Sequence, residues 1–146
     1  MNVYRHQQTA QWIVLLLAVP AVAVAVAGFL SGLYGMLGVA VFLILMAIAF
    51  SMMVTNVDER AVSWWFTLGF PNWSVPLADI AQVEVTTTTF WLEGYGLHYT
   101  IWHGWLWNVS GYGAVMLTTT AGNRITIGTN DPQGLYEAIE RFRSRV

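Results

Sequence analysis

A long stretch without charge constrains this chain more than any other feature. Between Arg5 and Asp58 there is no Asp, Glu, Lys or Arg, and every acidic residue lies at or after Asp58. Charged residues make up only 10% of the chain, against about 25% in an average soluble domain. The sequence therefore divides into an apolar N-terminal segment, residues 1–57, and a water-soluble C-terminal part, residues 58–146.

Two apolar runs, residues 12–30 and 33–54, fill the N-terminal segment. Each has about 20 residues, which is enough to cross a hydrocarbon core of about 30 Å. The connection between them is short and uncharged, which predicts a helical transmembrane hairpin that serves as an anchor, since neither run carries an ionisable residue. Small residues offer surfaces for close helix packing: Ala21, Ala23, Ala25, Ala27, Gly35 and Gly38.

Arginines flank the two runs and indicate an orientation. Arg5 precedes the first run, Arg60 follows the second, and the turn between them has none. The positive-inside rule then places both termini and the C-terminal domain in the cytoplasm of a multi-pass inner-membrane protein. The alternative is a signal peptide over residues 1–25, with Ala23-Val-Ala25 as its cleavage motif.

The C-terminal part changes to a period of two, which is typical of β-strands. Val62, Trp64 and Phe66 alternate with more polar positions, and residues 114–120 and 124–129 predict a hairpin. A helix over residues 132–144 should follow, with Asp131 as its N-cap, Pro132 at its first position and a Glu137–Arg141 pair on its surface. These patterns predict a small, mainly antiparallel β domain of barrel type, closed by a C-terminal amphipathic helix.

Two segments, "PLADIAQVEV" and "GYGAVMLTTTAGNRITIGTNDPQGLYEAI", resemble the bacterial PH-like domain. Such domains often follow one or two transmembrane helices in small membrane proteins. The resemblance covers roughly residues 58–146 and rests on structural residues without a catalytic motif. It therefore implies an architecture and leaves the function open.

The distribution of charge disfavours two classes of partner, nucleic acids and phosphoinositides. From Asp58 onward there are eight acidic residues and five arginines, which disfavours binding to nucleic acid. The resemblance to PH domains implies that phosphoinositides would be bound by a basic loop between the first two strands. The corresponding loop here, residues 69–73, has no Arg or Lys, so binding of phosphoinositides is disfavoured as well. Phe70 and Trp73 in that loop either enter the bilayer interface or cover the end of the domain.

Residues 90–107 hold four of the eight tryptophans of the chain, and this segment predicts a long hairpin folded at Trp102-His-Gly104. Its rings belong to the core, to a protein interface or to a surface that rests on the bilayer. We expect a membrane-anchored adaptor without catalytic activity, bound to a protein partner, to a second copy or to the bilayer. The expected contact residues are Trp91, Tyr95, Tyr99, Trp102 and Trp105, together with Phe70 and Trp73.

A metal, a cofactor or a catalytic site is not expected. The chain has no Cys, and the five-residue spacing of His98 and His103 places them on opposite faces of a strand. His6 is expected on the far side of a membrane helix. The alternative hypothesis is a ligand- or metal-binding barrel, or an enzyme, that uses His98, His103 and Glu93.

Overall fold

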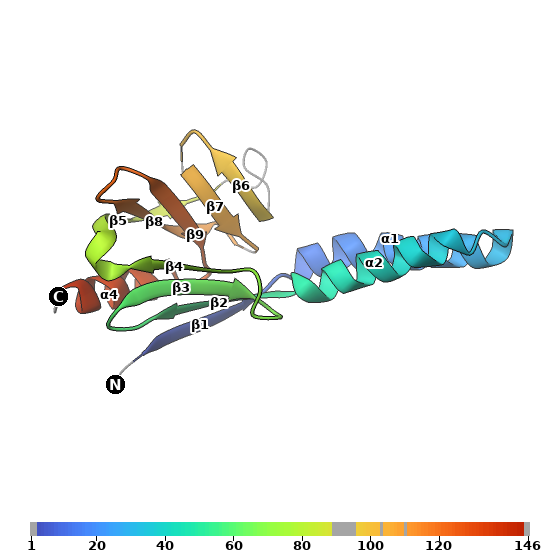
Figure 1. Ribbon diagram of the computed structural model, residues 1–146, viewed down its shortest axis with the longest axis horizontal. Helices are drawn as coiled ribbons and strands as arrows, with labels where there is room; N and C mark the ends of the chain where they lie inside the picture. Colours follow the sequence, from blue (N-terminus) through green and yellow to red (C-terminus); the bar gives the residue numbers. More distant parts are fainter. Residues whose placement is uncertain (1–2, 89–95, 103, 110, 145–146) are drawn as a thin grey trace.

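Two long apolar helices project from one end of a β structure, and a shorter helix packs at the other end (Figure 1). This computed structural model describes residues 3–88, 96–102, 104–109 and 111–144, with the backbone alone at residues 96–98. The two N-terminal helices, the sheets and the C-terminal helix confirm the expected layout. The helices are α1 (Gln11–Ser31), α2 (Gly35–Ala49) and α4 (Pro132–Arg143), and a 3-10 turn, η1, spans Leu77–Asp79.

The strands form two sheets that do not close into a barrel over the described residues, so the expected barrel is wrong. The first sheet has the order β1-β2-β3-β4 and the second β5-β8-β9-β7-β6. All neighbours are antiparallel except β7 and β9, which are parallel. The strands are β1 (Tyr4–Thr9), β2 (Met52–Val57), β3 (Ala61–Phe66), β4 (Asn72–Pro76), β5 (Ile80–Thr87), β6 (Gly96–Thr100), β7 (Gly104–Asn108), β8 (Gly113–Thr119) and β9 (Arg124–Gly128).

The helical hairpin is inserted between the first two strands of a sheet. β1 precedes α1 and pairs with β2, so that Tyr4 lies opposite Val57 and Thr9 opposite Met52. The expected second span, residues 33–54, is therefore too long, because α2 ends at Ala49 and β2 begins at Met52. A continuous apolar run does not distinguish a buried strand from a helix.

Of the described helices, α1 is long and apolar enough to cross a membrane, by its length and composition alone; α2 is shorter, at 15 residues. The two helices pack along a seam of small residues. Ala21 and Gly28 on α1 are buried, as are Ala40 and Ala47 on α2. A Cβ at Gly28 would lie 2.8 Å from the Cβ of Met36, so only glycine allows this approach.

The expected seam was wrong in most of its residues. In each helix the buried pair is two turns apart, which places both members on the inner face. Of the six small residues expected there, Ala21 alone is buried. The exposed members of that set are Ala23, Ala27, Gly35 and Gly38.

Alternation along β3 confirms the expected inward face. Val62, Trp64 and Phe66 are buried, and the residues between them are partly exposed. In α4, four residues at helical spacing complete the same core: Leu135, Ala138, Ile139 and Phe142.

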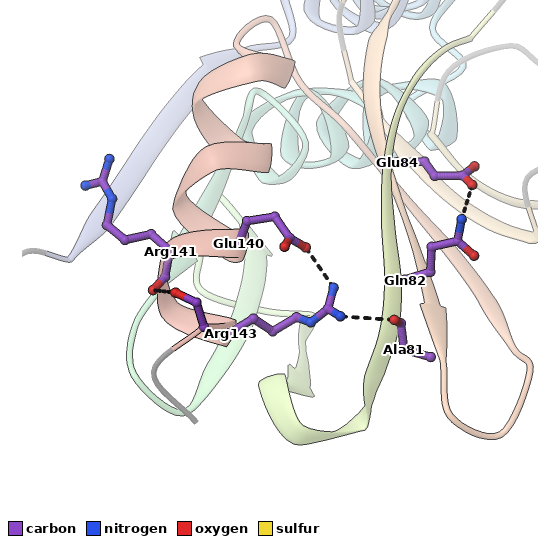
Figure 2. A network of polar contacts seen from close by, with 7 residues as sticks. Ala81, Gln82, Glu84, Glu140, Arg141 and Arg143 are labelled. Atoms are coloured by element: carbon purple, nitrogen blue, oxygen red, sulfur yellow. Dashed lines mark hydrogen bonds and ion pairs between the residues drawn. The ribbon is translucent and has the colours of Figure 1, made fainter.

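Polar contacts fasten both ends of α4. Asp131 Oδ1 accepts a hydrogen bond from Gly134 N at 3.0 Å, which makes it the expected N-cap. At the other end, Arg143 donates to the Glu140 carboxylate at 2.7 Å and to Ala81 O on β5 at 3.1 Å (Figure 2). The expected pair of Glu137 with Arg141 does not form, and the Glu137 carboxylate accepts from Gln133 Nε2 at 2.9 Å.

Three tryptophan rings join the two sheets. Trp107 of β7 packs edge-on against Trp64 of β3 and Trp73 of β4, with ring centroids 5.2 Å apart in both pairs. Aromatic pairs with this geometry are more favourable than the buried area alone implies. Trp64 Nε1 and Trp107 Nε1 are both buried, and neither has a hydrogen-bond acceptor among the described residues.

Replacing Trp107 with Ala should lower the free energy of unfolding by about 3–5 kcal/mol, because it leaves a cavity between the sheets. Trp105→Ala is the matched control, since that ring is half exposed in the same strand. Denaturant titration of the full chain in detergent, followed by circular dichroism, measures both. Equal losses for the two variants would contradict the role given to Trp107.

Candidate contact surface

The β6–β7 hairpin carries the described part of the tryptophan-rich segment, folded at the expected turn. Gly104 begins β7 with a φ of 67°, a value that favours glycine. A Cβ at this position would lie 2.1 Å from Arg124 O, so glycine also permits the close approach of β7 to β9. The Arg124 guanidinium donates to Trp102 O at 3.4 Å. Backbone constraints therefore fix where the hairpin turns.

Apolar side chains cluster at this turn and face solvent. Ile101 is 84% exposed and Trp102 75% exposed. Trp105 is 49% exposed and packs edge-on against the exposed Tyr99 ring at 5.8 Å. We call these four residues the hairpin-tip surface. Figure 1 shows the turn between β6 and β7 set back from the base of the helices, on the upper edge of the domain.

Two further expected contact residues, Trp73 and Phe70, do not join this surface. Trp73 is partly buried and packs on the core through Phe66 and Trp107. Phe70 is 77% exposed, but it lies in the turn between β3 and β4, at the base of the helices (Figure 1). Trp91 and Tyr95 lie outside the described residues. The five described residues therefore separate into a tip, a base and a core position.

The residues of the alternative hypothesis are not assembled into a described site. His98 lies in β6 opposite Leu106, and its side chain is outside the described part, as are Glu93 and His103. Within residues 3–88, 96–102, 104–109 and 111–144, no three His, Asp or Glu side chains converge as metal ligands. The space between the two sheets is filled by aromatic and aliphatic side chains.

A polar cluster that the sequence analysis missed ties β1 to the segment before α4. Tyr4 Oη donates to Asp131 Oδ2 at 3.0 Å, and Gln8 Nε2 donates to Gly128 O at 2.6 Å. Between them, His6 Nε2 contacts Asn130 Oδ1. His6 therefore lies in the β structure, and its expected position beyond a membrane helix is wrong.

The sequence did contain a signal for this cluster. Tyr4, His6 and Gln8 occupy every second position, which is the spacing of one face of a strand. A groove of about 420 Å³ lies beside it, between β1 and α4. The groove is open to solvent and has one carboxylate and one guanidinium in its lining. Its residues are Val3, Tyr4, Gly134, Glu137, Ala138, Arg141 and Phe142.

The chain matches no protein-family model, no curated protein and no solved structure. The resemblance to the PH-like domain therefore stays a prediction.

Burial raises the pKa of the Tyr4 phenol, and its hydrogen bond to the Asp131 carboxylate raises this pKa further. The folded-state pKa of Tyr4 exceeds the unfolded value of about 10. The phenol therefore contributes its full stabilisation of the fold at any pH below the unfolded-state pKa. Its contribution is lost as the pH rises through the folded-state pKa.

Tyr4→Phe should therefore lower the free energy of unfolding by about 1 kcal/mol at neutral pH and reduce the loss of stability at alkaline pH. Denaturant titrations at pH 7 and at rising alkaline pH measure both effects. An unchanged alkaline profile in the variant would contradict the link between Tyr4 and Asp131.

Proposed function

We propose that this protein is a membrane-anchored binding module of the PH-like kind, without catalytic activity, that docks a protein partner through the hairpin-tip surface. The exposure of this surface is the observation that carries the proposal. Four large side chains lie at one turn, and two of them, Ile101 and Trp102, are at least three-quarters exposed. Tryptophan and tyrosine are the residues that protein interfaces favour and in which binding energy concentrates.

The position of the surface favours a protein over the bilayer. β6 runs away from the helices toward the turn, and β7 returns toward them (Figure 1). A bilayer that surrounds α1 would begin at the base of the helices, and the turn is set back from that level. Exposed rings at such a position are available to a partner in solution.

The anchor in this proposal consists of α1 and α2 together, in a multi-pass arrangement with both termini and the β domain in the cytoplasm of a bacterial inner membrane. Two observations support it. Both helices leave the same end of the sheet, where Ala10 N donates to Ser51 O at 2.7 Å. Arg5 and Arg60 both lie in the β part, on the side that the positive-inside rule assigns to the cytoplasm.

A photo-crosslinking amino acid in place of Trp102 tests the partner. In native membranes we expect an adduct with a protein, and no such adduct from the same group in place of Ala121. Ala121 is an exposed residue in the turn between β8 and β9, which makes it a matched control. An adduct with a second copy would identify the partner as this chain itself, whereas lipid adducts or crosslinks within the chain would contradict the proposal.

Ile101→Ser and Trp102→Ala should each change the free energy of unfolding by no more than about 0.5 kcal/mol, because both side chains are largely in solvent. Loss of a buried interface tryptophan costs about 2 kcal/mol or more of binding free energy, so partner affinity should fall more than tenfold. The loss of affinity is measured as the crosslinking yield of a photo-crosslinking amino acid placed at Tyr99, compared with and without Trp102→Ala. A variant that unfolds would show instead that the tip is part of the core.

A further inference from the structure

The turn between β3 and β4 lies at the point where the helices leave the β structure. Thr67 Oγ1 and Ser51 Oγ are 2.8 Å apart, which joins the end of β3 to the residue before β2. The rings of Phe66 and Phe50 pack edge-on at 4.9 Å. Figure 1 shows this turn beside the base of α1 and α2.

This turn presents apolar side chains to solvent. Leu68 is 69% exposed and Phe70 77% exposed, on either side of Gly69. The backbone between them is held by a hydrogen bond from Gly69 N to Phe66 O at 2.8 Å. An ordered turn that exposes two large apolar side chains marks a contact site.

Among the described residues, the charged groups of the β2–β3 turn and of α4 lie away from this end of the domain. The acidic turn between β2 and β3, with Asp58 and Glu59, lies at the opposite end of the same two strands, because β2 begins at the helices. The charged helix α4 also lies at the far end (Figure 1). At the base itself, Trp12 is exposed in the first turn of α1, and aromatic rings at this level are typical of a membrane interface.

We infer that the β3–β4 turn inserts Leu68 and Phe70 into the interface of the bilayer that holds the helices. The lipid surface is the occupant because the turn is continuous with the helix base and has no charged side chain. The insertion is a third attachment beside the two helix ends, and it fixes the rotation of the domain over the membrane. This inference rests on the membrane anchor proposed above.

Single cysteines test the insertion in a chain that has none of its own. Leu68→Cys and Phe70→Cys, labelled with an environment-sensitive fluorophore, would be reconstituted as the full chain in phosphatidylcholine vesicles that contain a nitroxide lipid. We expect quenching by the nitroxide several times stronger than for Ala121→Cys, and weaker quenching by aqueous iodide.

A label at Phe42→Cys, exposed on α2, separates the two proposals. One outcome is that the nitroxide lipid quenches the label at Phe42, while iodide quenches the labels at Leu68 and Phe70 as strongly as the label at Ala121. In that case the membrane anchor stands and the insertion of the turn is wrong. If the Phe42 label is itself open to iodide, the anchor is wrong and the insertion falls with it. Circular dichroism of each labelled variant confirms that the sheets and helices are intact.

Discussion

The packing of Trp107 against Trp64 and Trp73 is the interaction on which the rest of the structure depends. The two sheets do not close into a barrel over the described residues, and without cysteine the chain has no disulfide to join them. Apolar contacts between the sheets, completed by α4, therefore hold the β structure together. Large aromatic side chains suit this task because each buries a large area and the edge-on pairs add specific geometry. Two indole N–H groups in this cluster have no acceptor in the described part of the chain, and the packing of the rings has to exceed the cost of burying them.

The second constraint is the insertion of a helical hairpin between β1 and β2. A strand that pairs across such an insertion closes a long loop, and the entropic cost of closure rises only slowly with loop length. Side chains as well as the ladder hold β1 in place: Tyr4, His6 and Gln8 contact the segment from Gly128 to Asp131. α1 follows β1 after one residue, Ala10. Hence the position of the first helix is fixed by the domain, and a flexible linker is not part of the connection.

Sequence patterns predicted the elements whose signals are local. The alternation in β3, the hairpin of β8 and β9, the turn at Gly104 and the capped helix α4 depend on residues within a few positions of each other. β1 was missed because its partner lies beyond both helices and because its inward residues are polar. The end of α2 was misplaced because Met53 and Val54, buried in a strand, continue an apolar run. The set of contact residues was predicted as one surface, but whether a ring such as Trp73 or Phe70 faces the core or solvent is decided by tertiary packing.

The aromatic rings also connect the two exposed apolar regions. From the hairpin tip, Tyr99 contacts Trp105, and Trp105 contacts Trp107 at a centroid distance of 6.2 Å. From there the contacts continue through Trp73 and Phe66 to Phe50, at the end of α2. The buried rings of this path, Trp107 and Phe66, have few alternative arrangements, since protein interiors are as dense as organic crystals. The direction of the tip relative to the helices is therefore set by packing along the whole path. For the docking proposed above, rings that are already held by packing would lose little conformational entropy on association.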